Sequence, residues 1–316
     1  RILDSYGHNT IIVAPATQQS GQGGRSVFTN VGNLTADSQY GLVPAGAPSV
    51  GQDPLDSSIW YYNGTPAACT FVALDYVLPN FANFTTPDLF VSGPNFGTNL
   101  GPFLYTLSGT IGSTYSAIER SIPGIAFSAS NSEIAYTNIT NTTNPATYAA
   151  QVAADIVQGI LEATPEGQAV LPLGYGINVN IPPLNDTYQS PPVVKSRLTG
   201  NADVDIAVYN ATTGTFRYAN IEPPAAGVNQ CINGDCSLPG ETYVVESGMT
   251  SISVFTVDYD APATYTTDLV FDKFDAFAVG GNGTSGSGSG SGRGWGGKWG
   301  NPGKGWVRRS VDYRHS

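Results

Sequence analysis

Short apolar strands alternate with helices over the first 180 residues, and this alternation constrains the fold more than any other property of the chain. Three helices begin after a capping residue, namely Thr65, Ser108 and Asn144, and a short one ends before Gly7. Strands are expected where apolar or β-branched residues run between turn-forming residues, at 9–13, 89–91, 124–128 and 178–181. Such alternation predicts an α/β fold with a mostly parallel sheet and right-handed crossovers. The run at 89–91 is uniformly apolar, so that strand is expected to be covered on both faces.

The pattern changes at about Ser196. Strands joined by turns rich in Gly, Pro and Asn are expected at residues 203–209, 242–245 and 251–257, which predicts an antiparallel β region appended to the α/β core. Beyond Gly280 a Gly/Ser linker leads to a tail that holds three tryptophans and has no periodicity. We therefore expect one domain over residues 1–279, with 196–279 as its appended β-rich part, and a disordered tail over residues 280–316.

Acidic residues dominate the chain outside its tail. Six of the 13 basic residues follow position 292, which leaves 7 basic against 23 acidic residues before it. So acidic a body argues against nucleic-acid binding. No stretch approaches the length of a membrane span, so no membrane partner is expected. The basic, Trp-containing tail favours contact with acidic surfaces or with the polysaccharide of a cell wall.

Glycosylation acceptors and cysteines indicate a secreted protein of the extracellular space or cell wall. Eight Asn-x-Ser/Thr triplets lack a central proline, at Asn33, Asn63, Asn83, Asn138, Asn141, Asn185, Asn210 and Asn282. Some of them arise by chance in a chain rich in Asn and Thr. Cys231 and Cys236 flank a turn-forming Ile-Asn-Gly-Asp, so a disulfide between them is expected in an oxidising compartment. Cys69 falls in an apolar helical pattern and is expected to be buried.

A polar, glycine-rich loop follows the strand at 89–91, where open α/β sheets bind ligands. In it, Asn95 offers a hard carbonyl oxygen, and Ser20 offers a hydroxyl from the loop after the first strand. Both suit Mg²⁺ or Mn²⁺. Ser108, Gly109 and Thr110 open a helix, where free N–H groups and the helix dipole favour a phosphate. A metal beside an anion site is the arrangement for phosphoester hydrolysis, although asparagines in glycine loops are more often turn residues and Ser-Gly-Thr is more often a helix cap.

Several motifs in one order resemble the SurE family of metal-dependent phosphatases and nucleotidases. They are Gly7-His8, Val13-Ala-Pro15 with Ser20-Gly21, Gly64-Thr-Pro-Ala67, Val91-Ser-Gly-Pro-Asn-Phe-Gly-Thr-Asn-Leu-Gly101, Ser108-Gly-Thr-Ile-Gly112, Ile122-Pro-Gly-Ile-Ala-Phe-Ser128 and Asn178-Val-Asn-Ile-Pro182. The acidic, sequon-rich version here is similar to the secreted fungal acid phosphatases. The resemblance implies a Rossmann-like three-layer sandwich that hydrolyses phosphomonoesters, including nucleoside monophosphates, with Mg²⁺ or Mn²⁺. It also implies a homodimer or homotetramer.

The resemblance implies a role for each matching position. Ser20 and Asn95 are implied metal ligands, and Ser108, Gly109 and Thr110 are the implied phosphate site, with Asn99 beside them at the substrate and shaping the loop. The family pattern begins with a strand ending in Asn-Asp-Asp-Gly, whose aspartates hold the metal, and this chain starts after that strand. Asp4 lies on the following helix and does not replace them.

The sequence is compatible with three functions. The first is a secreted phosphatase whose full gene supplies the aspartates, so that this chain alone is inactive and represents a truncated record or a mispredicted gene start. A shortened natural protein that folds poorly or is inactive is the other interpretation of its start. The second function is a non-catalytic secreted glycoprotein that keeps the anion pocket and adheres to surfaces through its tail. The third, a carbohydrate-active enzyme, rests only on acidity and aromatic content.

Overall fold

A computed structural model describes residues 1–139, 143–198, 205–220, 237–263 and 265–274. The chain forms two compact units, Arg1–Asp260 and Ala261–Ser316. Within the second unit, the described residues form helix α8 (Tyr265–Phe271) and a 3₁₀ turn at Asp272–Phe274. The expected disulfide between Cys231 and Cys236, the sequons at Asn141 and Asn282, and the expected tail at 280–316 all lie outside the described residues.

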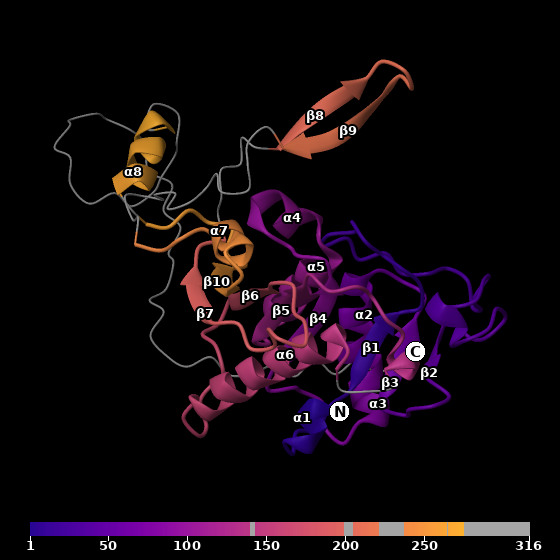
Figure 1. Ribbon diagram of the computed structural model, residues 1–316. Helices are drawn as coiled ribbons and strands as arrows, with labels where there is room; N and C mark the ends of the chain where they lie inside the picture. The colour runs from indigo at the N-terminus through magenta and orange to yellow at the C-terminus, as the bar shows by residue number, and fades with distance from the viewer. Residues whose placement is uncertain (140–142, 199–204, 221–236, 264, 275–316) are drawn as a thin grey trace, which may run out of the picture. The chain divides into compact units, whose positions relative to one another are not determined.

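A five-stranded sheet forms the centre of the first unit (Figure 1). Its strand order is β4-β5-β6-β10-β7, with bounds Phe90–Phe96, Gly124–Ala129, Tyr175–Ile181, Thr250–Thr256 and Val193–Ser196. Strands β4, β5 and β6 are parallel, β10 runs antiparallel to β6, and β7 is parallel to β10. The predicted strand at 251–257 is therefore part of the main sheet.

Two smaller sheets accompany it. Strand β1 (Ile12–Pro15) pairs in parallel with β3 (Ile59–Tyr62), and β2 (Val50–Gln52) pairs antiparallel with β3. The hairpin of β8 (Asp205–Asn210) and β9 (Thr215–Asn220) is antiparallel, as predicted for the region after Ser196. Among the described strands, β1 and β4 each pair on one side only.

Helices cover both faces of the main sheet and complete three layers (Figure 1). The helices of the first unit are α1 (Ile2–Ser5), α2 (Pro66–Val72), α3 (Leu78–Phe81), α4 (Gly101–Leu107), α5 (Gly109–Glu119), α6 (Pro145–Glu162) and α7 (Glu241–Glu246). A π-helical segment at Ala73–Val77 joins α2 to α3, and single 3₁₀ turns lie at Gln39–Gly41 and Tyr136–Asn138. As predicted, Thr65, Ser108 and Asn144 cap α2, α5 and α6 with their side chains.

Side-chain alternation along β5 and β6 decides which face is apolar. Ile125 and Phe127 of β5 and Val179 and Ile181 of β6 are fully buried in one cluster with the apolar side of α6. Burial of each such side chain contributes about 2 kcal/mol. The alternate residues of the same strands lie on the other face, and Ser128, Asn178 and Asn180 among them are buried polar residues. The sheet thus has one apolar face and one partly polar face.

Two sequence-based expectations were wrong. The strand at 89–91 was expected to be covered on both faces, but Val91 is 37% exposed, because β4 lies at an edge of the sheet and pairs only with β5 among the described strands. The strand expected at 242–245 is helix α7, in which Val244 and Val245 are buried. Packing of that valine pair therefore overrides the β-propensity of the segment.

Candidate functional site

Asn95 lies at the carboxyl end of β4, opposite Ser128 of β5 in the parallel register. Its side-chain Nδ2 donates to the carbonyl oxygens of Phe96 at 2.7 Å and Gly97 at 2.8 Å. These two bonds fix the amide, and no described residue donates to its Oδ1. The half-buried Asn95 therefore presents an oriented carbonyl oxygen at the end of the strand.

The amino end of α5 leaves backbone N–H groups without partners in the helix. Ser108 is buried, and its Oγ accepts from the N–H of Ile111 at 3.3 Å. The first α-helical bond runs from the N–H of Gly112 to the carbonyl of Ser108 at 2.9 Å. The N–H groups of Gly109 and Thr110 precede that bond, so they point out of the helix with the positive end of its dipole.

Packing explains the glycine at position 109. A Cβ there would lie 2.8 Å from Cγ of Pro66, the first residue of α2, and 3.5 Å from the carbonyl oxygen of Gln19. A larger residue would force the start of α5 away from both neighbours. The glycine thus keeps the helix end close to the loop that carries Ser20.

Two contacts place Ser20 and Asn95 at the same rim as the start of α5. The Oγ atoms of Ser92 on β4 and Ser113 on α5 are hydrogen-bonded at 2.6 Å. From this contact, β4 continues forward to Asn95, and α5 traced backward reaches Thr110, so both residues lie toward the same edge. The N–H of Gly23 donates to the carbonyl of Leu107 at 2.8 Å. Ser20 itself is exposed, with its N–H on Oε1 of Gln18 at 2.6 Å.

Asn99 lies beneath the loop and is 6% exposed. Its N–H donates to Oδ1 of Asn180 at 2.7 Å, and its Nδ2 donates to Oγ of Ser128 at 2.7 Å. Its carbonyl oxygen accepts from Nδ2 of both Asn178 and Asn180 at 3.1 Å each. All of these partners are protein groups, so the structure shows Asn99 as a residue that holds the loop. Its substrate contact stays a prediction.

Glu241, the first residue of α7, is a buried acid that the sequence did not single out. It is 1% exposed, and burial raises the pKa of its carboxyl to about 8 even though three donors oppose the shift. Its Oε1 accepts from the N–H of Gly101 at 2.7 Å. The asparagines of β6 carried a readable signal, since polar residues alternate with apolar ones in a strand with buried neighbours.

The described residues do not by themselves make a site for Mg²⁺ or Mn²⁺. Ser20 and Asn95 offer neutral oxygens, and no group of three or more His, Cys, Asp or Glu side chains in the described residues could hold a metal ion. A divalent cation normally needs carboxylates among its oxygen ligands. Additional anionic ligands would be required at this rim.

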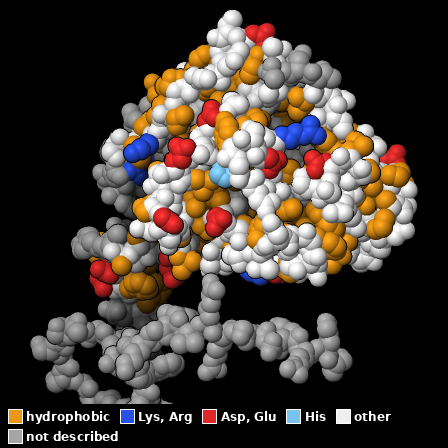
Figure 2. Space-filling view, turned by 90° about the horizontal axis from the view of Figure 1, so that it is seen from below, with side chains coloured by type: hydrophobic (Ala, Val, Ile, Leu, Met, Phe, Trp, Pro, Cys, Tyr) orange, Lys and Arg blue, Asp and Glu red, His pale blue; other side chains and the backbone are white. Residues whose placement is uncertain are grey.

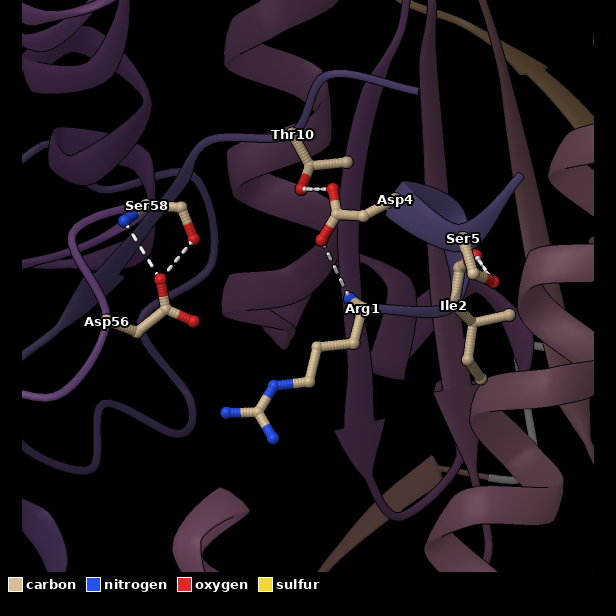
Figure 3. Close-up of polar contacts among 7 residues, drawn as sticks. All are labelled: Arg1, Ile2, Asp4, Ser5, Thr10, Asp56 and Ser58. Atoms are coloured by element: carbon tan, nitrogen blue, oxygen red, sulfur yellow. Dashed lines mark hydrogen bonds and ion pairs between the residues drawn. The ribbon is translucent and has the colours of Figure 1, made fainter. Parts of the chain in front are cut away.

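Acidic and imidazole groups near the chain start lie at the other end of β1 from the Ser20 loop. Figure 3 shows Asp4 bonded to Oγ1 of Thr10 at 2.5 Å and to the amino terminus at 3.2 Å. The Thr10 bond is the main cause that lowers the pKa of Asp4. His8 contacts Oε1 of Gln158 on α6 at 2.7 Å. Asp4 and His8 are thus both engaged in contacts at the end of β1 away from the Ser20 loop.

An open hollow of about 510 Å³ lies in the loop from Ala163 to Pro172, at the end of β6 away from Asn99. The face in Figure 2 shows more acidic than basic side chains, dispersed among hydrophobic and uncharged atoms.

In the described part of the chain, no helix is long and apolar enough to cross a membrane. Cys69 is buried, as expected, and burial raises its pKa to about 12.

Most described sequon asparagines are on the surface. Five of them are exposed, namely Asn33, Asn83, Asn138, Asn185 and Asn210, and Asn63 is half-buried. Some of these side chains bond to the protein, as Asn83 does by accepting from Nδ2 of Asn9 at 2.6 Å. Their exposure is compatible with glycosylation and leaves the modification a prediction.

Comparisons with known proteins agree with this geometry. The family model "Survival protein SurE" matches residues 1–203. An acid phosphatase from Yarrowia lipolytica is 42% identical over 278 residues, which cover 85% of this chain and 77% of that protein. A 5'-nucleotidase SurE from Desulforamulus reducens is 38% identical over a shorter stretch, 39% of this chain and 40% of the relative.

Among solved structures, the SurE protein from Aquifex aeolicus superposes with a TM-score of 0.57 at 23% identity, covering 86% of this chain and 91% of that one. This likeness confirms the predicted α/β fold. The family match extends over more than half of the chain, and the order of its motifs agrees with the position of the loop, the α5 start and β6. The chain belongs to the SurE family.

Proposed function

We propose that this protein is a phosphomonoester hydrolase of the acid phosphatase or 5'-nucleotidase type, with a phosphomonoester such as a nucleoside monophosphate as substrate. The observation that carries the proposal is the start of α5, where two free N–H groups face the rim that also holds Asn95. Relatives named acid phosphatase and 5'-nucleotidase support it. A phosphate is a suitable ligand for such a helix end.

The described residues bind and orient the phosphoryl group in this proposal. The N–H groups of Gly109 and Thr110 donate to phosphate oxygens, and Ser108 holds the helix end in place through its cap. Asn95 directs its Oδ1, which is an acceptor, toward the position proposed for the metal and not toward the phosphate oxygens. The N–H contacts act on a doubly charged ester, so they gain strength from the charge of the ligand.

A divalent metal, Mg²⁺ or Mn²⁺, is part of the proposal, with Ser20 and Asn95 as two of its ligands. When bound, such a metal supplies Lewis-acid polarisation of the phosphoryl group and an activated water. The neutral oxygens described above do not hold it alone. In this proposal, the carboxylates that complete the site are the aspartates expected ahead of Arg1. DNA sequence upstream of Arg1 tests whether they are encoded.

The first prediction concerns activity. A gene product that contains Asn-Asp-Asp-Gly ahead of Arg1 should release phosphate from p-nitrophenyl phosphate or a nucleoside monophosphate, and a chelator should abolish the release. Asn95→Ala should lower kcat/KM by about 100-fold or more, in the range of losses for a single oriented oxygen at a reacting centre. The chain Arg1–Ser316 alone should release little or no phosphate.

Asn80→Ala is the matched control, because Asn80 is an exposed asparagine on α3 whose Nδ2 donates to the carbonyl of Tyr76 in the preceding π-helical segment. It should keep full activity. Activity that resists chelator, or an unaffected Asn95→Ala variant, would contradict the metal assignment. A gene that encodes no aspartates upstream, together with an inactive protein, would favour the non-catalytic, surface-adhering glycoprotein.

Secretion to the extracellular space or cell wall, glycosylation, the Cys231–Cys236 disulfide and a homodimer or homotetramer are further parts of the proposal. The relative named acid phosphatase and the exposed sequons support secretion. Enzymatic deglycosylation of the natural protein should reduce its mass, and light scattering should give a multiple of 33.0 kDa for the unglycosylated chain. Contact of residues 280–316 with cell wall is tested by pull-down with and without that segment.

A further inference from the structure

A layer of buried polar side chains lies directly beneath the Gly97–Gly101 loop, on the partly polar face of the main sheet. Each member is less than a tenth exposed, and the set comprises Ser128, Asn178, Asn180, Ser196, Glu241, Ser251 and Ser253; Asn99 of the loop itself is also buried. Burial of so many polar groups is unfavourable unless they are hydrogen-bonded. The polar side chains of this layer therefore supply hydrogen bonds that an apolar core could not supply.

Glu241 forms hydrogen bonds to three different parts of the structure. Its Oε1 accepts from the N–H of Gly101 at 2.7 Å, and its Oε2 accepts from Nδ2 of Asn178 at 3.1 Å and from Oγ of Ser253 at 3.0 Å. Ser253 contacts Ser196 at 2.8 Å. One carboxyl group thus ties α7, β6 and β10 to the backbone where the loop ends.

The loop is held by hydrogen bonds at two of its residues, Asn99 and Gly101. Asn178 bonds both to Glu241 and to the carbonyl oxygen of Asn99, and Glu241 holds the N–H of Gly101. Gly101 has a φ of 77°, a conformation that costs a glycine little but needs support to persist in one form. From Gly101 the chain passes through the single short helix α4 to Ser108.

The loop fixed at Asn99 and Gly101 has Asn95 on one side and the start of α5 on the other. A displacement at Gly101 would therefore move both halves of the candidate site relative to each other. Errors of about 1 Å in such placement cost on the order of 100-fold in rate. The hydrogen bond from Gly101 to Glu241 of α7 therefore acts at a point that controls the positions of Asn95 and of the α5 start.

We propose that Glu241 is a positioning residue: its carboxyl group holds the Gly97–Gly101 loop in the geometry that phosphate binding at the start of α5 requires. The inference rests on the proposed function for its ligand. Glu241 does not touch the substrate, because its oxygens contact groups within the fold. Its role is to keep Asn95 and the α5 start in register.

Amide hydrogen exchange and binding of inorganic phosphate test the proposal on the chain Arg1–Ser316. In Glu241→Ala, the amides of Asn99 and Gly101 should exchange about 10- to 100-fold faster, because the buried N–H of Gly101 loses its acceptor and the loop loses its support. Amides of Ile125–Phe127 in β5 should keep their rates, which separates a local loss from global unfolding. The dissociation constant for phosphate should rise about tenfold.

Three further variants sharpen the test. Glu241→Gln keeps an acceptor for Gly101 and should restore most of the exchange protection and phosphate affinity; it also decides the matter if Glu241→Ala does not fold. Ser196→Ala removes a buried polar group of the same layer that has no contact with the loop, and Glu246→Gln changes an exposed acid on the same helix. Both should stay within about twofold of wild type.

The outcomes separate the two proposals. Unchanged loop exchange in both Glu241 variants, with β5 intact, would overturn the positioning role whatever the protein binds. Failure of wild-type protein to bind phosphate, with and without Mg²⁺, would count against the proposed function, and the positioning of the loop would then be decided by the exchange rates alone. Faster exchange with unchanged phosphate affinity would overturn the link between the loop and the anion site.

Discussion

Gly109 offers the sharpest single-residue test of the anion site. In Gly109→Ala the new Cβ meets Cγ of Pro66 at 2.8 Å, so the start of α5 must move away from α2 and the Ser20 loop. Overpacking of this kind costs about 1 to 3 kcal/mol of stability. We expect phosphate to bind about tenfold more weakly to the variant, by isothermal titration calorimetry.

Gly159→Ala is the control for that substitution. Gly159 lies inside α6, and a Cβ there would have no neighbour within 4 Å. Alanine should therefore raise stability by about 0.5 to 1 kcal/mol through helix propensity and leave phosphate binding unchanged. Equal phosphate affinity in the two variants would contradict the assignment of the α5 start as the anion site.

Residues of the site differ in how well the sequence alone could predict them. Asn95 and Ser108 stand in local patterns, a strand end with glycines and a helix cap, so their positions could be predicted. Glu241 stands 140 residues from its partner Gly101, and only the fold brings the two together. Local sequence patterns carry no information on such a contact.

At the scale of elements, Thr65 joins α2 to the loop that carries Ser20. Its Oγ1 caps the helix by accepting from the N–H of Ala68, also accepts from the N–H of Val27 at 3.0 Å, and donates to the carbonyl of Arg25 at 2.5 Å. Thr65→Val keeps the shape but loses all three bonds, so we expect a loss of about 2 to 3 kcal/mol in urea unfolding.

Thr65→Ser is the matched variant, because it retains the hydroxyl and loses only a methyl group. It should stay within about 1 kcal/mol of wild type. Equal destabilisation in the serine and valine variants would show that packing of the methyl, rather than the hydroxyl, holds this junction. Limited proteolysis near Gly21–Ser26 should then distinguish a loosened loop from a loosened helix.

Elements were predictable where capping and periodicity agree, as in α2, α5 and α6. They were not where tertiary packing opposes propensity. The Val244–Val245 pair favours a strand locally, yet α7 forms because both valines and Glu241 are buried against the main sheet. Strand β4 is likewise more exposed than its apolar sequence indicated, because it lies at an edge of the main sheet as described.

For the whole molecule, the pH dependence of stability has a definite sign. The pKa of Glu241 is raised by burial from 4.5 to about 8, so between these values the folded protein holds a proton that the unfolded chain has released. Stability from this group is therefore full below about pH 4.5 and falls as pH rises toward 8, by an amount on the order of 4 kcal/mol. The formal charge of −11 adds repulsion in the same direction.

The last prediction separates these two contributions. Glu241→Gln is neutral at every pH, so its free energy of unfolding should fall less steeply between pH 4.5 and 8 than that of wild type, although a Gln amide facing two donors lowers stability by a constant amount. Glu246→Gln removes one exposed charge from the same helix and should keep the wild-type slope. Urea unfolding at half-unit pH steps measures all three slopes. Parallel curves for wild type and Glu241→Gln would mean that Glu241 titrates as it does in the unfolded chain. The repulsion of surface charges would then account for the whole pH dependence.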